Sequence, residues 1–532
     1  MKARTLILSA AALTLVIAGL VPVLGLLTST FFSYGRGSTL FLERFAGSAQ
    51  PWLPLIRSFA VSSLTTLFAF LVGLPLGILL GRSDLPLRRC MTFLFTIPLV
   101  IPPYILAVLW FYLLERQGIV RRIFSPRIAE YTSGWLFGLP GCVLVLTSVM
   151  LPVVMLLVMV LLKTVNPRLE EGGRAVAGWP RILQGITLPL ILPGILLAAI
   201  LVFLLSFGEF GVPMYLRTEV FPVEAFTRFA AFFDPGAAAS ACLPMILITL
   251  AFLIIEHRYL QSQTYALRPL QGSQDSSLIR LGNARQWILV ICSCLCTLFV
   301  LLPLSVLLGE ALPGGAIREA TVRAQDSMMR SLAYAGIGAT LLTSVGFLLG
   351  YMIRNKALRV WKGLDSLCVF LFAMPSTVIG IGMVTVWNHP VTAFIYATPA
   401  ILLLGYLAQY SAIAARASVS TLTQLPSSME EAAQVAGAGW MLRFCRIVVP
   451  LSWKGIVGIW LVSFIFCLRD TGISMMVYPP GHDTLPVRIF TLMANGSTAL
   501  VSSLCLLMCL ATIIPLSLAG LFLHLQWRGG RT

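Results

Sequence analysis

Two carboxylates in this sequence stand at the same distance from two prolines. Glu209 follows Pro189 by 20 residues, Asp470 follows Pro450 by 20 residues, and each acid ends a long apolar run. A glycine comes two residues after each acid. Ionisable groups at the end of an apolar helix are costly unless they are paired or hydrated, which makes them functional candidates. Two acids near the outer mouth of a path across a membrane would suit a cation.

Other interpretations of the two acids stay open at the level of sequence. Both could mark the outer ends of ordinary helices. Arg469 stands beside Asp470, which also permits a plain local ion pair. The glycines Gly211 and Gly472 instead permit a helix break that lines a cavity. We therefore treat Glu209 and Asp470 as candidates for lining a translocation path.

Two polar segments interrupt the apolar sequence and match each other. Each begins with adjacent glutamates: Glu170 and Glu171 in the first, Glu430 and Glu431 in the second. From Gly178 onward the first segment matches the second at an offset of 261 residues, so that Gly178 corresponds to Gly439. A single such segment could be an ordinary surface helix with a favourable dipole. Two copies at matching places favour one duplicated task at the membrane surface.

Both polar segments carry signals for short helices. Asn166 and Pro167 predict the start of the first, because Asn caps free amides and Pro suits the first helical position. The run Ser427 to Glu430 has the spacing of a capping box. Gly437 and Gly439 would let the chain turn out of the second helix.

The remaining residue patterns do not indicate catalysis. A loop that cradles phosphate needs Gly-Lys-Ser/Thr, and no Gly-Lys dipeptide occurs in the sequence. The four histidines are scattered without zinc spacing. Cys292, Cys294 and Cys296 alternate within an apolar run and are interpreted as small buried side chains rather than metal ligands. We expect no catalytic residue, no metal site and no cofactor.

The elements that must position these residues are membrane helices. Of 532 residues, 58% are hydrophobic and 11% charged, whereas soluble domains carry about 25% charged residues. Twelve apolar runs are long enough to cross a bilayer, centred near residues 17, 68, 103, 150, 197, 250, 298, 342, 377, 405, 458 and 512. They are apolar on every face, unlike barrel strands. The net charge of +17 does not indicate nucleic-acid binding, because no soluble basic domain carries it.

The distribution of basic residues predicts the orientation of the chain. With both termini in the cytoplasm, 23 of the 37 Lys and Arg residues lie inside and 14 outside, as the positive-inside rule favours. One outer loop disagrees with this orientation, because it contains four arginines: Arg116, Arg121, Arg122 and Arg127.

The N-terminus resembles a signal peptide, but its apolar run extends to about Leu27 without a convincing cleavage site. We therefore expect a retained first helix.

The sequence divides into two similar halves. We expect a first half of six helices at residues 1–265, a cytoplasmic linker at 266–285, and a second half at 286–532. Ser58 through Gly77 matches Ser331 through Gly350 at offset 273. Further matches follow in the same order, at offset 277 for Phe93, Phe95, Pro98 and Trp110, and at offset 264 for Pro222, Val223, Phe226 and Thr227. Two parallel repeats imply a pseudo-two-fold axis along the membrane normal.

The second polar segment resembles a family signature. The signature is Glu-Ala-Ala, three residues, Gly, nine residues, Ile-x-Leu-Pro, and the segment supplies Glu431, Ala432, Ala433, Gly437, Ile447, Val449 and Pro450. This pattern resembles the signature loop of permease subunits of binding-protein-dependent ABC importers. The first segment departs from it. Counting back from Ile186 puts Glu170 at the glutamate position and Val176 at the glycine, whereas a one-residue gap places Ala177 there.

The resemblance covers nearly the whole chain and implies an all-α, type I permease with two fused halves. Each segment would form a coupling helix seated in a cleft of an ATPase subunit. The implied partners are two ATPase subunits, an extracytoplasmic solute-binding protein and the lipid bilayer, without nucleic acid. The chain itself would be no enzyme but a multi-pass protein of the bacterial inner membrane. The coupling residues would be Glu170, Glu171, Gly178, Glu430, Glu431, Ala432, Ala433 and Gly437.

Substrate and rival functions are less sharply indicated. The stretches at residues 207–211 and 478–488 look most similar to those of ferric-iron permeases, whereas thiamine, polyamine and phosphonate permeases share the architecture. A secondary transporter also uses repeated halves, but it would be expected to have broken helices and ion-coupling acids near the midplane. Acids within the apolar runs are nearly absent. A membrane-embedded enzyme would need a reactive constellation that the sequence does not show.

Overall fold

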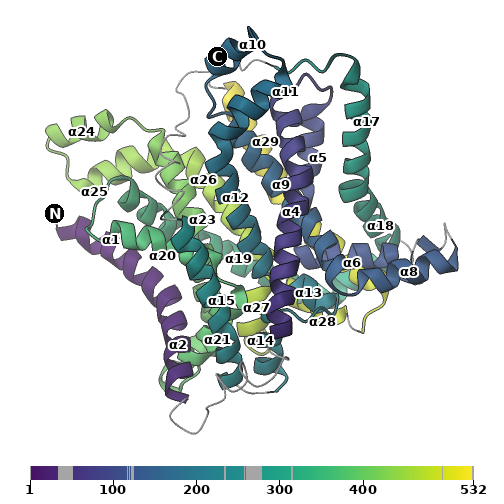
Figure 1. Ribbon diagram of the computed structural model, residues 1–532. Coiled ribbons are helices and arrows are strands. Elements are labelled where there is room, and N and C mark those ends of the chain that lie inside the picture. Colours follow the sequence, from purple (N-terminus) through teal and green to yellow (C-terminus); the bar gives the residue numbers. More distant parts are fainter. Residues whose placement is uncertain are drawn as a thin grey trace. The chain divides into compact units, whose positions relative to one another are not determined.

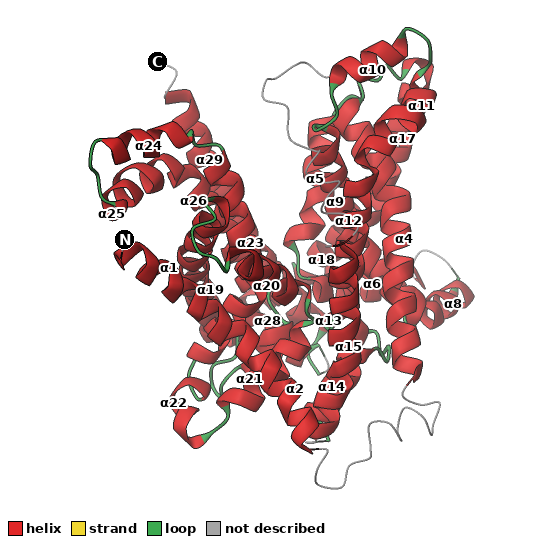
Figure 2. Ribbon diagram, turned by 60° about the vertical axis from the view of Figure 1, so that its left-hand side comes forward, coloured by secondary structure: helices red, strands yellow, loops and turns green. Residues whose placement is uncertain are grey.

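The computed structural model describes residues 2–33, 52–116, 118, 120–121, 125–232, 235–256, 258, 278–312, 315–493 and 495–529 (Figure 1). Over these ranges the chain forms helices and loops, with a single isolated β-bridge (Figure 2). Most of the linker expected at residues 266–285 lies outside the described residues, as do His257 and Arg122.

The helices of the first half and of the connection that follows it range from short surface helices to long apolar ones. They are α1 (Lys2–Leu15), η1 (Val16–Leu20), α2 (Val21–Ser33), α4 (Trp52–Arg82), α5 (Arg88–Val100), α6 (Pro103–Leu114), α8 (Pro126–Leu136), α9 (Leu139–Leu162), α10 (Pro167–Arg174), α11 (Trp179–Ile182), η3 (Leu183–Thr187), α12 (Leu188–Phe207), α13 (Gly211–Tyr215), α14 (Phe221–Ala230), α15 (Pro235–Ile255) and η5 (Gly282–Ala284).

The second half repeats this series of helices. Its elements are α17 (Arg285–Cys296), η6 (Thr297–Leu301), α18 (Leu302–Ala311), α19 (Ala316–Arg354), α20 (Trp361–Ala373), α21 (Ser376–Trp387), η8 (Pro390–Thr392), α22 (Ala393–Tyr396), α23 (Ala400–Thr423), α24 (Ser427–Val435), α25 (Trp440–Arg443), η9 (Phe444–Val448), α26 (Val449–Leu468), α27 (Gly472–Val477), α28 (Leu485–Leu492) and α29 (Thr498–Gly529).

The all-α polytopic fold is confirmed. Among the described residues, ten helices are long and apolar enough to cross a membrane, or up to twelve if each of two bent pairs is one span. The bent pairs are α5 with α6, at 102°, and α20 with α21, at 106°. They coincide with the runs expected near residues 103 and 377. Broken helices therefore occur here too, so they do not single out a secondary transporter as the sequence argument assumed.

The bent pairs correct one register of the repeat. Helices α5 and α6 correspond to α20 and α21 at an offset of 273, since their first residues are 88 and 103 against 361 and 376. The same offset relates Ser58 in α4 to Ser331 in α19, although α19 begins earlier in its half. Pro102 and Pro375 precede the second helix of each pair, with φ of −55° in both. The match of Pro98 to Pro375 at offset 277 was wrong, because Pro98 lies inside α5. Apolar, aromatic-rich sequence allowed a slip of about one helical turn.

From α9 to the start of α13 the two halves correspond at offset 261, except at the short helices α10 and α24, whose first residues are 260 apart. The change from 273 to 261 means that the first half carries 12 extra residues between α6 and α9. The connections agree, with 24 residues at 115–138 and 12 residues at 388–399. The longer connection includes α8, which has no counterpart of its length in the second half.

Four π-helical segments lie at corresponding places and have one cause. Each of η1, η3, η6 and η9 ends two residues before a proline: Pro22, Pro189, Pro303 and Pro450. Proline lacks the backbone N–H and its ring clashes with the carbonyl four residues earlier. The residue before each proline bonds the carbonyl five residues back, as Leu188 does with Leu183 and Val449 with Phe444. The wider turn keeps the helix continuous past the proline.

The described chain forms two packing units that interleave the halves. One unit contains residues 1–44, 224–246 and 310–532, and the other contains residues 45–223 and 247–309. In the first unit α2 packs against α21 and α1 against α19, whereas in the second α17 and η6 pack against α5. The first helices of each half therefore belong to the packing unit of the other half.

Small residues allow close packing in both cores. Helix α4 packs along α9, and α19 packs along α23. A Cβ at Gly73 would lie 2.9 Å from Val154 Cβ, and one at Gly346 would lie 2.4 Å from Ala414 Cβ. Without a hydrophobic driving force between helices in lipid, such small residues let backbones approach and gain dispersion contacts.

Candidate functional site

The first polar segment folds as the short helix α10, anchored by a buried ion pair. The Asn166 side chain accepts from the Arg168 backbone N–H at 3.1 Å, and Pro167 is the first helical residue, as predicted. Arg82 Nη1 lies 2.6 Å from Glu170 Oε2, and the Thr187 hydroxyl donates to Glu170 Oε1 at 2.8 Å. Arg82 is 4% and Glu170 is 1% exposed. Glu170 thus ties α10 to the helices beneath it.

The second polar segment folds as α24 and is anchored differently. The expected capping box does not form: Pro426 is the N-cap residue, no side chain caps the helix, and Ser427 is its first residue. Glu430 Oε1 instead accepts from the Tyr351 hydroxyl at 2.5 Å. The Trp440 indole N–H donates to that hydroxyl at 3.2 Å. A neutral phenol therefore replaces the arginine that anchors α10.

The anchors separate the glutamates into two kinds. Glu170 and Glu430 point inward to partners, whereas Glu171 and Glu431 are exposed. Matching the segments by these partners pairs Glu171 with Glu431, which corresponds to the alignment with a one-residue gap. Val176 and Val435 are 86% and 89% exposed, so both segments also present apolar side chains to the outside.

The two loop helices end differently. Gly437 has φ of +81°, and the Ala438 N–H bonds the Ala433 carbonyl across it, a left-handed C-terminal cap that suits glycine. Gly439 has an extended conformation and is the N-cap residue of α25, so it does not share that role. In the first loop the Val176 N–H bonds the Gly173 carbonyl in a tighter turn. Val176 is not left-handed, which spares a β-branched residue a strained conformation.

Each loop leads into a long helix that ends at one of the candidate acids. The spans run from Trp179 to Phe207 and from Trp440 to Leu468. Glu209 Oε1 then accepts from the Gly211 N–H at 3.1 Å, and Asp470 Oδ2 accepts from the Ser474 N–H at 2.8 Å. Each acid therefore accepts from an N–H in the first turn of the short helix that follows a chain break, α13 or α27. The helix break that the flanking glycines permit is therefore observed in both halves.

The two acids differ in their surroundings. The Tyr410 hydroxyl donates to Asp470 Oδ1 at 2.6 Å, the Ser474 hydroxyl donates to Oδ2 at 2.8 Å, and Asp470 is 4% exposed. Tyr410 corresponds to Val149 at offset 261, so the first half has no phenol at this position. Glu209 is half-buried. Asp470 is held from two helices, and Glu209 keeps more access to its surroundings.

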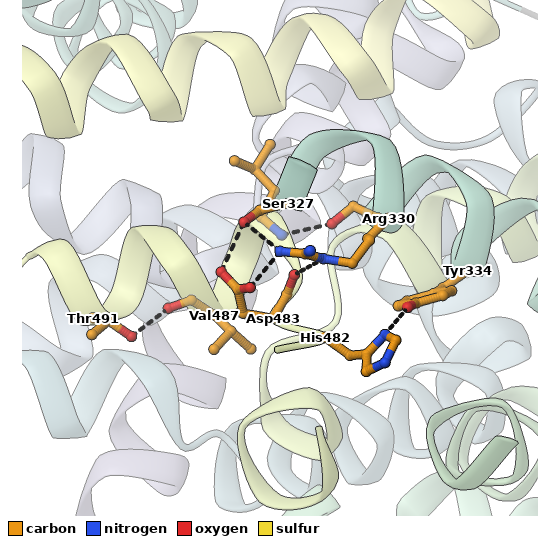
Figure 3. A network of polar contacts seen from close by, with 9 residues as sticks. Ser327, Arg330, Tyr334, His482, Asp483, Val487 and Thr491 are labelled. Carbon is orange, nitrogen blue, oxygen red and sulfur yellow. Dashed lines mark hydrogen bonds and ion pairs between the residues drawn. The ribbon is translucent and has the colours of Figure 1, made fainter. Parts of the chain in front are cut away.

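A further group of polar contacts, between α19 and the loop before α28, was not predicted from the sequence. Arg330 Nη2 lies 2.5 Å from Asp483 Oδ1, and the Ser327 hydroxyl donates to Asp483 Oδ2 at 2.7 Å (Figure 3). Tyr334 and His482 hydrogen-bond beside them, with 2.7 Å between the phenol oxygen and Nδ1. This network ties α19 to the loop before α28.

The first half has a simpler version of the same contacts. Arg57 Nη1 lies 2.6 Å from Glu219 Oε2. Arg57 and Arg330 differ by 273 residues and Glu219 and Asp483 by 264, the offsets already known for these regions. In both halves the following serine accepts from the first N–H of the next helix, as Ser331 does from Leu485 at 2.6 Å. Extending the sequence matches at these two offsets to the neighbouring residues would have predicted both ion pairs.

Comparison with known proteins gives the family. The model of the binding-protein-dependent transport system inner membrane component matches residues 73–262 and 343–525, one copy in each half. The chain belongs to this family. The family is a transport component rather than a catalytic enzyme, and the chain is a multi-pass membrane protein.

Three relatives of this permease chain differ in how much of it they cover. The ferric transport system permease protein FbpB 1 of Haemophilus influenzae is 25% identical over 423 residues, 74% of this chain and 65% of that protein. The molybdenum transport system permease protein ModB of Escherichia coli is 28% identical over 212 residues, 38% of this chain and 91% of its own length. The ABC transporter permease protein y4fN of Sinorhizobium fredii is 22% identical, covering 96% of this chain and 94% of its own. The chain thus spans just under two thirds of the ferric relative.

Proposed function

We propose that this chain forms the translocation path of an ATP-driven solute importer. The carrying observation is the repeated unit that runs from an anchored surface helix, through a π-helical turn, along a full span, to an acid at a chain break. A displacement of α10 or α24 would be passed along a continuous helix to α13 or α27. Such a rigid connection is what coupling to an external motor requires.

The exposed faces of α10 and α24 are the docking surfaces for ATPase subunits. Glu171 and Glu431 are exposed beside apolar Val176 and Val435. Buried Glu170 and half-buried Glu430 hold each helix to the residues beneath it, so that a movement of the helix is transmitted to the rest of the chain. Gly178, Gly437, Ala432 and Ala433 shape the loops around these faces. Two such surfaces imply two ATPase subunits for each copy of this chain.

The assembly and its placement follow from the same proposal. An extracytoplasmic binding protein delivers the solute, and the lipid bilayer surrounds the spans. The chain resides in a bacterial inner membrane with both termini and both loop helices on the cytoplasmic side, as the arginine and lysine distribution favours.

Ferric iron is the proposed substrate. The relative from Haemophilus influenzae is named for ferric transport, and each chain break here carries a carboxylate. Glu209, which is half-buried whereas Asp470 is buried, is the better candidate to meet a passing cation. Asp470 shares the position in the repeat, with its carboxylate held by Tyr410 and Ser474. A permease for thiamine, a polyamine or a phosphonate remains the alternative.

Native mass spectrometry of the chain, co-expressed with the ATPase encoded by an adjacent gene, tests the stoichiometry of the assembly. The proposal expects one copy of this chain with two ATPase subunits, and no ATP hydrolysis by the purified chain alone. The matched control is a double variant, Glu171→Lys with Glu431→Lys, which should release the ATPase while leaving the chain folded. A transport-competent assembly without any ATPase would overturn the proposal.

A further inference from the structure

The insertion unique to the first half contains a helix with three distinct faces. At 3.6 residues per turn, the buried residues of α8 fall on one side: Ala129, Ser133 and Leu136. This side packs on α6 and α9, and the Thr132 hydroxyl donates to the Leu114 carbonyl at 3.1 Å. The helix is therefore fixed to the body of its unit rather than hanging free.

The second face of α8 is apolar and exposed. Ile128, Tyr131 and Trp135 follow one another at helical spacing and are 45%, 84% and 52% exposed. Tyrosine and tryptophan have amphipathic rings and are enriched where a membrane meets water. Leaving such a stripe in water would be costly, at about 25 cal/mol for each Å² of apolar surface.

The third face of α8 is charged. Arg127, Glu130 and Gly134 lie on it, and Glu130 forms an exposed ion pair with Arg116 at 3.2 Å. Arg121 is also exposed close by in the chain. Figure 1 shows α8 running across the direction of α4 and α17, helices of the same packing unit. A helix that runs across the direction of its membrane-crossing neighbours lies along the membrane surface.

We propose that α8 is an interfacial helix that rests on the lipid headgroup region. Its buried face holds the protein, its Ile128–Tyr131–Trp135 stripe enters the acyl boundary, and its charged face meets water and lipid phosphates. This also accounts for the arginines of this loop, which run against the charge bias of the chain. In this proposal these arginines contact lipid headgroups and do not determine the orientation of the chain in the membrane. The connection before α9 is 12 residues longer than its counterpart in the second half, and this extra length accommodates α8.

Photocrosslinking of the full chain in lipid nanodiscs tests this placement. Benzoylphenylalanine replaces Tyr131 in one variant and Gly134 in a matched control on the charged face of the same helix. No heavy atom lies within 4 Å of a Cβ at Gly134, so the control is tolerated. Nanodiscs of phosphatidylethanolamine and phosphatidylglycerol are illuminated with the binding protein present, and adducts are identified by mass.

The proposal expects several-fold more phospholipid adducts from position 131 than from position 134. Equal lipid yields at the two positions would overturn it, as would adducts of position 131 mainly with the binding protein. If the variant at position 131 fails to accumulate, the same probe at Trp135 lies on the same stripe and gives the same discrimination. The result does not depend on transport, so it stands or falls separately from the importer proposal.

Discussion

Arg82 and Glu170 form a buried ion pair at 2.6 Å beneath the first loop helix, whereas Glu430 beneath the second loop helix bonds a tyrosine. Two copies of one structural unit thus keep the same inward glutamate and change its partner. An ion pair in the interior is sensitive to loss of one member, because the other is left as an unpaired charge. A half-buried carboxylate bonded to a phenol can recover water when the phenol is removed.

We therefore expect the anchors to respond unequally to mutation. Arg82→Met should destabilise the chain by about 3–5 kcal/mol, seen as a lower unfolding temperature in detergent. Tyr351→Phe removes the hydrogen bonds that join the hydroxyl to Glu430 and to Trp440. Both partners are half-buried and can bond water instead, so the change should cost about 1.5–3 kcal/mol. Equal shifts for the two variants would show that the Arg82–Glu170 pair is not the stronger constraint.

A second prediction concerns the exposed glutamates. Glu171→Lys and Glu431→Lys should each weaken ATPase binding without changing the unfolding temperature, because neither side chain is buried. Glu431 lies in the loop that fits the family signature, so its reversal should have the larger effect. Affinity for the purified ATPase, measured by surface-immobilised binding, checks this order. Glu170→Lys is no substitute for Glu171→Lys, since it would place a cation beside Arg82 and damage folding.

Much of this arrangement could be predicted from the sequence, because duplication makes weak signals repeat. The two loops, the equal spacing of Glu209 and Asp470, and the helix breaks after them were all readable as matches at one offset. Local signals were less secure: the capping spacing at Ser427 is present, yet Glu430 is engaged by Tyr351 instead. A side chain drawn to a tertiary partner is unavailable to cap its own helix.

Other features could not be predicted because they depend on contacts between distant segments. The exchange of α1–α2 and α17–α18 between packing units leaves no local trace in an apolar sequence. Arg82 stands 88 residues before Glu170, and nothing in its neighbours indicates the pairing. By contrast, the prolines that cause the π-helical turns recur at matching places in the two halves of the sequence, Pro22 and Pro303 in one pair and Pro189 and Pro450 in the other.

The third prediction separates the two acids. Glu209→Gln should reduce uptake with little change in stability, because Glu209 is half-buried and its capping bond to Gly211 can be kept by an amide oxygen. Asp470→Asn should reduce stability as well, because an amide cannot accept all the hydrogen bonds from Tyr410 and Ser474. The double variant should transport least. Uptake at matched protein amounts, together with unfolding temperature, distinguishes them, and unchanged uptake in the double variant would remove both acids from the path.

The fourth prediction concerns the contacts before α28. Asp483→Asn should cost more stability than Glu219→Gln, because the Arg330–Asp483 pair is mostly buried and joined by Ser327, whereas the Glu219 side chain is 67% exposed. Exposed pairs contribute about 0.2–1 kcal/mol. Thermal unfolding of the two variants provides the comparison. A larger loss for Glu219→Gln would mean that the two halves are held at this position by different contacts from those described.

The most direct test of the importer account is uptake into sealed proteoliposomes. Vesicles contain this chain with its ATPase, an internal fluorescent iron chelator, and either ATP or a non-hydrolysable analogue at the ATPase face, while the binding protein carries ferric iron on the opposite face. The account predicts iron entry only with ATP, the ATPase and the binding protein together, and loss of entry in the Glu171→Lys/Glu431→Lys variant. Entry at the same rate with the analogue, or without the ATPase, would contradict it.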